Sequence, residues 1–177
     1  MYIKSRKMSK SKDLLFSECV GKLESWVVED QETEYLSALK LAQILSELYS
    51  LGLQLPGPGT ASTSSKEKEA MGESEMKEVL AAAQKLPIQY YHVALNPTDL
   101  SEENVGLGDL IDDVLDIYRD VVCANRQYAS GNREIALWHW NFDMKTHWGD
   151  HATNALNALN DYLVREAGAR VAGLMEP

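Results

Sequence analysis

Apolar side chains recur at three- and four-residue steps over most of this chain, which is the period of an amphipathic helix. The first such pattern begins at Asp13, which we expect to cap a helix, and continues to Val27. The second runs from Tyr35 to a C-terminal cap at about Gly52. Because the connection is short, we predict that these two helices form an antiparallel pair.

Residues 53–74 interrupt the pattern with prolines, glycines and a polar run, which predicts a flexible loop or, as the less favoured alternative, a lid. A third helix is predicted from about Ser74, and Pro87 ends or kinks it. Residues 88–95 fit a short helix or an extended piece, and residues 104–108 fit a loop. We find no alternation of apolar and polar residues that would indicate a strand.

A fourth helix is predicted to begin at Asp109 as its N-terminal cap. One face of this helix is an apolar stripe. The opposite face carries five carboxylates within an arc of about 100°: Asp109, Asp112, Asp113, Asp116 and Asp120.

The last helix is predicted to run without a break from Arg133 to Glu166. Apolar side chains, including Trp138 and Phe142, surround most of its circumference, so we expect this helix to lie at the centre of a bundle. His139 falls on the narrow polar arc and is expected to face solvent.

These patterns together predict an all-α fold, an antiparallel bundle of about five helices with a long, largely buried C-terminal helix. We expect one helical domain over residues 13–168, with the flexible loop 53–74 inside it. A disordered basic tail is expected at 1–12 and a second tail at 169–177.

The net charge of −10 argues against a nucleic-acid-binding protein, which needs a basic surface to neutralise phosphates. No apolar run is long enough to span a membrane, and no apolar segment follows the basic start as it would in a signal peptide. Cys19 and Cys123 lie far apart without redox or metal-binding spacing, so we expect free thiols. These features predict a soluble cytoplasmic protein that binds neither nucleic acid nor a membrane.

Four motifs stand out in the second half of the chain: L-P-I-Q-Y-Y at 86–91, D-D-V-L-D-I-Y-R-D at 112–120, A-L-W-H-W at 136–140 and H-W-G-D-H at 147–151. This half of the chain resembles an uncharacterised bacterial family, Domain of Unknown Function 5063. The resemblance implies an all-α domain and implies no activity.

His147 and His151 are four residues apart, so both imidazoles fall on one face of a helix and could share a metal ion. Asp116 on the preceding helix is the expected third ligand, and two His with one or two Asp suit zinc or non-haem iron. The alternative, which we favour, is a buried network in which the imidazoles bond to Asp116, Tyr118 or the backbone. Apart from this divalent metal, no cofactor is predicted.

A second group surrounds Arg119, which can pair with Asp116 three residues back. With Asp112, Asp113 and Asp120 nearby, Arg119 could form a clamp for an acidic ligand or partner. The simpler interpretation is a solvated acidic face with one structural ion pair.

Aromatic residues form a third group, which could line a small-molecule pocket but at this helical spacing is more typical of a core. Its members are Tyr118, Trp138, Trp140, Phe142 and Trp148.

No complete catalytic set is evident, because neither cysteine has a histidine partner in sequence and no glycine-rich phosphate loop is present. We therefore expect a non-catalytic interaction or regulatory protein. Its partner would be another protein or a second copy of the chain, docked on an exposed apolar patch of the first two helices. One alternative is a metal-binding protein, or even a metalloenzyme, that uses His147, His151 and Asp116. The other is a small-molecule sensor that uses the aromatic group.

Overall fold

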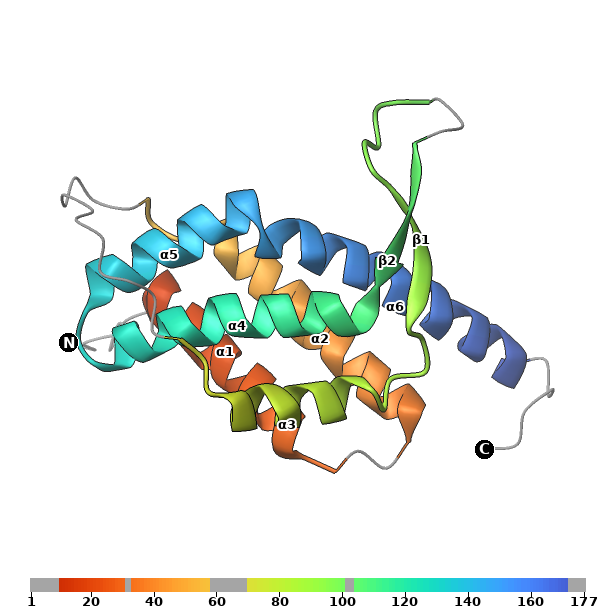
Figure 1. The fold of residues 1–177 in the computed structure, drawn as a ribbon, viewed down its shortest axis with the longest axis horizontal. Helices are drawn as coiled ribbons and strands as arrows, with labels where there is room; N and C mark the ends of the chain where they lie inside the picture. Colours follow the sequence, from red (N-terminus) through yellow and green to blue (C-terminus); the bar gives the residue numbers. More distant parts are fainter. Residues whose placement is uncertain (1–9, 31–32, 58–69, 101–103, 172–177) are drawn as a thin grey trace, which may run out of the picture.

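The computed structural model describes residues 10–30, 33–57, 70–100 and 104–171. It is predominantly helical, as expected, with six helices and one two-stranded sheet among the described residues (Figure 1). In chain order the elements are α1 (Lys12–Val28), α2 (Glu34–Gly52), α3 (Glu73–Ala83), β1 (Tyr90–Ala94), β2 (Val105–Asp109), α4 (Leu110–Ala129), α5 (Arg133–Thr146) and α6 (Trp148–Val171). Most of the two predicted tails and the middle of the predicted loop 53–74 lie outside the described residues.

Polar caps fix where two of the helices start. The Thr33 hydroxyl accepts a hydrogen bond from the Leu36 amide at 3.2 Å, which caps α2. Asp109 caps α4 as predicted, because its carboxylate accepts from the Ile111 amide at 2.9 Å. Asp13 does not cap α1, contrary to the prediction. It is buried and receives a hydrogen bond from Arg133 Nε at 2.5 Å, which ties α1 to the start of α5.

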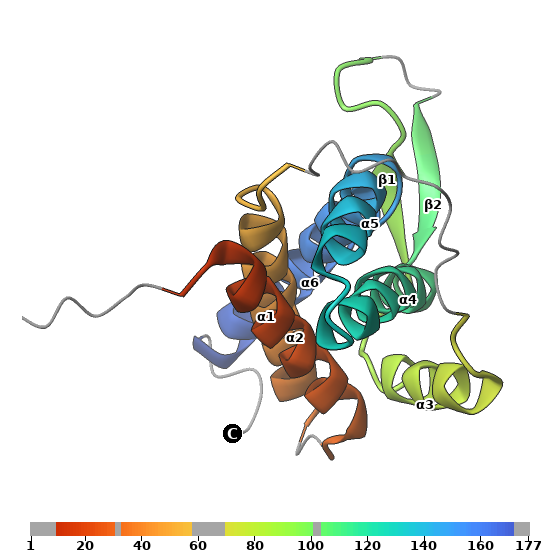
Figure 2. The ribbon, with the colours of Figure 1, turned by 90° about the vertical axis from the view of Figure 1, so that its left-hand side faces the viewer.

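The central helix of the bundle is α4, which packs against α1, α3, α5, α6 and β2. The views in Figures 1 and 2 show α4 between α3 on one side and the α5–α6 segment on the other. The prediction that the C-terminal helix is central was therefore wrong. The apolar stripe of α4, which includes Val114, Ile117 and Val121, is at most 1% exposed and joins the main hydrophobic core. Burying each such side chain contributes about 1.5–3 kcal/mol.

The predicted unbroken last helix is two helices, α5 and α6, which meet at His147. His147 caps the end of α5 with φ −153° and ψ −86°, far from helical values. At the break the backbone folds so tightly that a Cβ on Gly149 would lie 2.0 Å from the Met144 carbonyl oxygen. Gly149 therefore permits the break. At its other end α6 continues through Gly168 to Val171, so residues 169–171 belong to the helix and not to the predicted tail.

Strands β1 and β2 form an antiparallel hairpin. Strand β1 agrees with the extended alternative for residues 88–95, whereas β2 lies where residues 104–108 were predicted to form a loop. In the hairpin Tyr91 lies opposite Gly108, and Val93 lies opposite Gly106. Strand β2 escaped recognition because its inward positions are glycines, which leave no apolar alternation to read. The side chains of Tyr91 and Val93 occupy the space above these glycines. Figure 1 shows the hairpin rising from the end of α4 and away from the bundle.

Candidate metal centre

The two histidines singled out in the sequence lie on either side of Gly149, at the α5–α6 break, and face α4. Their imidazole rings are adjacent, with centroids 4.8 Å apart and planes inclined at 72°. Helix α4 runs antiparallel to the α5–α6 segment along this contact, and the acidic face of α4 meets the histidines. Asp113, Asp116 and Asp120 are spaced by three and four residues and share one face of α4.

One nitrogen of each imidazole is held by a carboxylate of α4. His147 Nδ1 lies 2.7 Å from Asp120 Oδ2, and His151 Nδ1 lies 2.7 Å from Asp113 Oδ1. Asp113 and Asp120 are only 5% and 6% exposed. An ionised carboxylate only accepts hydrogen bonds, so each Nδ1 carries the proton and donates. Each histidine is therefore oriented by its own buried carboxylate.

The opposite nitrogens of the two imidazoles point toward one oxygen of Asp116. His147 Nε2 is 3.6 Å and His151 Nε2 is 3.5 Å from Asp116 Oδ2. These separations are too long for hydrogen bonds. One ligand atom from each of the three residues lies within 4.8 Å of the other two, so they surround a common point.

The two Nε2–Oδ2 separations suit an ion at that common point. Two ligands about 2.1 Å from one tetrahedral ion are about 3.4 Å apart, close to the Nε2–Oδ2 distances of the site. With a metal ion at that point, the Nδ1–H groups on buried carboxylates would be the outer hydrogen bonds that fix the imidazole tautomer and raise its basicity. The site keeps access to solvent, because the side chains of His147, His151 and Asp116 are 39%, 26% and 16% exposed. Solvent or a substrate would therefore occupy the remaining coordination positions.

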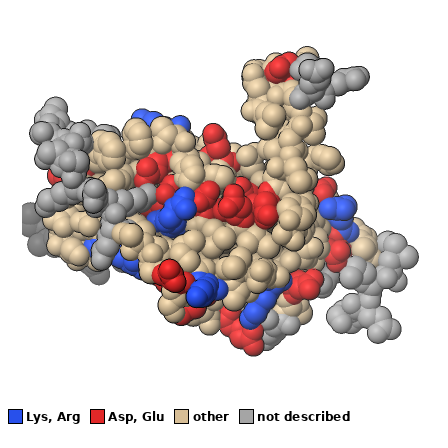
Figure 3. Space-filling view, viewed as in Figure 1, with Lys and Arg blue, Asp and Glu red and all other residues tan. Residues whose placement is uncertain are grey.

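The surroundings are strongly negative and favour a positive charge at the common point. Acidic side chains form a band along α4 in Figure 3. Arg119 donates a hydrogen bond to Asp116 Oδ1, which leaves Oδ2 facing the histidines. The hydrogen bond with Asp113 raises the pKa of His151. Burial lowers this pKa, and the charges of Asp113, Asp116 and Asp112 raise it further. The site thus attracts cations, whether a proton on an imidazole or a metal ion.

The second predicted group divides between two environments. Arg119 pairs with Asp116, and Asp112 is exposed beside them, as expected of a solvated face. Asp113 and Asp120 are buried, so the expectation of a fully solvated acidic face was wrong for these two. They are buried because the α5–α6 segment covers this side of α4 and supplies histidine partners. Tyr118, a predicted partner of the histidines, instead donates to Glu75 of α3 at 3.3 Å.

The aromatic group is mostly core, as its spacing suggested. Trp140 and Trp148 have no exposed surface and pack against Phe16 at ring centroid distances of 4.7 and 6.0 Å. Their indole N–H groups are satisfied, since Trp140 Nε1 donates to Val121 O at 3.1 Å and Trp148 Nε1 donates to Trp140 O at 3.3 Å. A sensor pocket around these two residues therefore has no space.

The side of α5 predicted to be most buried is in fact partly exposed. Phe142 is 48% exposed and stacks on the half-buried Trp138 with centroids 4.8 Å apart. His139, expected to face solvent, has a side chain only 12% exposed and packs edge-on against Trp138. The helix break explains both differences. The apolar arc was predicted for one continuous helix, and it does not coincide with the face that α5 buries.

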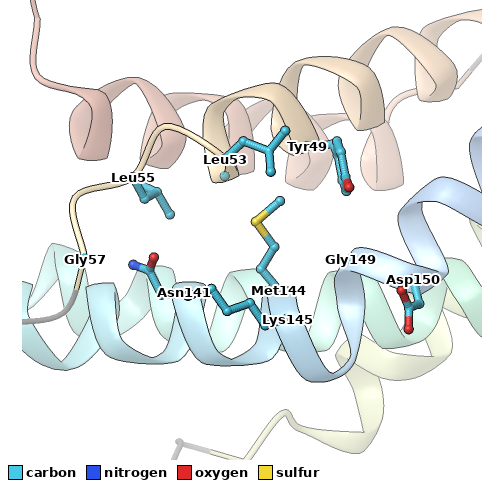
Figure 4. A pocket seen from close by; sticks show the side chains of 10 residues that line it. Tyr49, Leu53, Leu55, Gly57, Asn141, Met144, Lys145, Gly149 and Asp150 are labelled. Atoms are coloured by element: carbon cyan, nitrogen blue, oxygen red, sulfur yellow. The ribbon is translucent and has the colours of Figure 1, made fainter.

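A hollow of about 460 Å³ lies beside the α5–α6 break (Figure 4). The view shows Leu53 and Tyr49 of the α2 end facing Met144 and Asn141 of α5, with Gly149 at the edge. No tryptophan lines this hollow. It therefore does not realise the predicted aromatic sensor pocket.

Several polar contacts that shape the molecule were not predicted from the sequence. Arg126 of α4 holds α3 through Glu75, with Nη2 2.5 Å from both carboxylate oxygens. Tyr91 of β1 donates to Asp113, one of the buried carboxylates of the site. These partners are far apart in the chain, so no local spacing could have revealed them.

Comparison with known proteins places the chain in a family. The family model described as a domain of unknown function (DUF5063) matches residues 25–165, and the chain belongs to this family. The match covers the main body, so the sequence resemblance was correct but not confined to the second half. A search of curated proteins found no match.

The fold also occurs in a solved structure. The crystal structure of protein BF1032 from Bacteroides fragilis is similar to this chain with a TM-score of 0.66 and 16% sequence identity. The similarity covers 89% of this chain and 99% of that one. At this identity it shows a shared fold, and neither comparison names an activity, ligand or partner. Among the described helices, none is both long and apolar enough to cross a membrane.

Proposed function

We propose that this protein binds one divalent transition-metal ion through His147, His151 and Asp116. The observation that carries this proposal is the convergence of both Nε2 atoms on one carboxylate oxygen while both Nδ1 atoms are held by buried carboxylates. A neutral imidazole protonated at Nδ1 turns its Nε2 lone pair toward Asp116. In that tautomer both Nε2 lone pairs and Asp116 Oδ2 face one another, and a cation at their centre, either a metal ion or a proton on one imidazole, relieves the repulsion.

The ligand set favours zinc or iron(II). Two imidazoles and one carboxylate with open positions are the donor set of non-haem iron(II) sites, and zinc accepts the same ligands. The set carries one negative charge, and the buried Asp113 and Asp120 add two more close by. This excess of negative charge favours a divalent ion over neutral occupants of the site. As part of this proposal we place the protein in the cytoplasm, because both cysteines are buried thiols.

Metal analysis of protein purified without a histidine tag, followed by Zn²⁺ titration of the metal-free form, tests the proposal. We expect one ion per chain and complete loss of binding in His147→Ala/His151→Ala. The matched control is His92→Ala, which removes an exposed histidine of the hairpin. A hundredfold excess of Zn²⁺ over its Kd should stabilise the wild type by about 2.7 kcal/mol. That gain corresponds to roughly 5–11 °C in Tm for a chain of this size.

A different result would favour the hydrogen-bonded network. If the wild type binds no Zn²⁺, and the double variant loses several degrees of Tm, the histidines act only as structural partners of Asp113 and Asp120. If His92→Ala abolishes binding instead, the ion binds on the hairpin and the assignment of ligands is wrong.

A second candidate function, self-association, rests on the hairpin. Five of the eleven large apolar side chains that are exposed in the described structure lie at residues 90–107, whereas three lie on α1 and α2, where the patch was expected. One hairpin face presents Tyr90 and Leu107 at 56% and 71% exposure. Two cross-strand pairs of this face, His92 with Leu107 and Ala94 with Val105, contain no Asp, Glu, Lys or Arg, and the one carboxylate, Asp109 opposite Tyr90, lies at its base where it caps α4. On a chain of net charge −10, this face lets a second copy approach with little repulsion.

Sedimentation velocity over a range of concentrations tests self-association. We expect a dimer that Leu107→Lys abolishes, because like charges would meet at the centre of the contact. Val28→Lys, at a 74% exposed position of α1, is the control and should not affect the dimer. A wild-type protein that stays monomeric at all concentrations would exclude this second candidate.

A further inference from the structure

The side chain of Tyr91 connects the hairpin to a carboxylate of the candidate metal centre. This residue lies on the inward side of β1, and its ring covers Gly108 of β2. A Cβ on Gly108 would come within 2.4 Å of the Tyr91 ring, so glycine at this position is what lets the ring lie flat across the hairpin. The hydroxyl then extends past the hairpin to α4, where it donates to Asp113 Oδ2.

Asp113 is therefore held at both oxygens. Its Oδ2 accepts from Tyr91, and its Oδ1 accepts from His151 Nδ1 at 2.7 Å. Burial raises the pKa of Tyr91, and the hydrogen bond and charge of Asp113 raise it further, so the hydroxyl stays protonated and donates. A carboxylate fixed from two sides has one orientation, and this orientation sets the direction of the His151 ring.

The base of the hairpin is fixed independently of Tyr91. Strand β2 runs directly into α4, and the Leu110 amide donates to Gln89 O at 2.8 Å. Removing the Tyr91 hydroxyl therefore leaves the hairpin attached to α4. What changes is the contact between the body of β1 and the carboxylate of Asp113.

We propose that Tyr91 is a positioning residue for the metal ligand His151, and that it couples the hairpin to metal binding. This inference rests on the proposed function. Because coupling between two events is reciprocal, a hairpin held against Asp113 strengthens metal binding, and a bound metal holds the hairpin in place. The chain of contacts runs from Tyr91 through Asp113 to His151.

The experiment compares Tyr91→Phe with Tyr90→Phe in Zn²⁺ titrations against a chromophoric chelator. Both variants lose one hydroxyl from adjacent positions of β1, but Tyr90 lies on the exposed face of the strand. Loss of a carboxylate that directly orients a histidine ligand weakens metal binding by about 10- to 100-fold, which is the effect we expect for Asp113→Asn. Tyr91 acts one hydrogen bond further away, so we expect its Kd for Zn²⁺ to rise about 3- to 10-fold, with no change for Tyr90→Phe.

Hydrogen exchange of the hairpin amides distinguishes coupling from a merely structural role. Zn²⁺ should slow exchange at residues 90–94 and 105–109 in the wild type and in Tyr90→Phe, but not in Tyr91→Phe. Equal Zn²⁺ affinities in all three proteins, or hairpin protection that does not respond to Zn²⁺, would overturn the role of Tyr91 while leaving the metal site intact. A wild type that binds no Zn²⁺ would overturn the proposed function and this inference with it.

Discussion

Gly149→Ala tests the helix break that brings the two histidines to α4. An added Cβ would lie 2.0 Å from the Met144 carbonyl oxygen, and real Cβ atoms essentially never approach closer than 3.0 Å. The backbone would therefore have to open by about 1 Å at the junction of α5 and α6, because the obstacle is a backbone atom and not a flexible side chain.

The magnitude follows from two opposing effects. Overpacking of this kind costs about 1–3 kcal/mol, and here it outweighs the higher helix propensity of alanine, which is worth up to about 1 kcal/mol. Trp148, fully buried beside Gly149, prevents the junction from relaxing outward without a loss of core contacts. We expect a net loss of roughly 1–2 kcal/mol, or about 2–8 °C in Tm.

Gly21→Ala is the matched control, because Gly21 lies within α1 and an added Cβ there meets no atom within 4 Å. Thermal unfolding followed by circular dichroism should show a lower Tm for Gly149→Ala and a Tm raised by about 1–4 °C for Gly21→Ala. Displacing the histidines by about 1 Å should also weaken Zn²⁺ binding by roughly tenfold or more. If both variants are equally stabilised, the tight junction at Gly149 does not exist in solution.

Two further predictions concern stability. Burial raises the pKa of Asp13, but hydrogen bonds led by that from Arg133 outweigh it and lower the pKa from 3.8 to about 2. The ionised carboxylate therefore stabilises the fold above pH 3.8, and its contribution is lost as the pH falls through 2. Because Arg133 is half-exposed, we expect Asp13→Asn to lower the free energy of unfolding at pH 7 by only about 1–2 kcal/mol. The variant should also flatten the pH dependence of urea unfolding between pH 2 and 4. An unchanged pH profile would contradict the ion pair. Trp140→Ala should cost about 3–5 kcal/mol in the same assay and Trp138→Ala less than half as much, and equal costs would refute the burial assigned to Trp140.

The sequence predicted the helices well where one strong apolar stripe faces one core. The stripe of α4 and its cap at Asp109 are examples, because both signals are local. The break at His147 was missed because Trp148, Ala152 and Ala155 continue an apolar arc, and periodicity does not register a change in helix direction. Strand β2 was missed for a related reason, since its inward positions are glycines.

The sequence predicted which candidate ligands lie together, but not which residues orient them. A spacing of four residues placed His147 and His151 together, and the acidic face of α4 suggested Asp116. That Asp113 and Asp120 are buried and orient the imidazoles depends on how α4 and α6 align, which no local pattern reveals. The contribution of Tyr91 depends in addition on a hairpin that was not predicted.

The two carboxylate–histidine pairs also govern how the chain selects one alignment of its helices. Asp113 pairs with His151 and Asp120 pairs with His147, so the partners run in opposite chain directions. Both pairs form together in only one register of α4 against the α5–α6 segment. Sliding α4 by one turn, about 5.4 Å, would leave a carboxylate buried against an apolar surface. Leaving a buried carboxylate without its hydrogen-bond partner costs about 1–3 kcal/mol, a penalty that the apolar stripes by themselves do not impose. During folding, the pairs would therefore reject misaligned bundles that the hydrophobic core alone would accept.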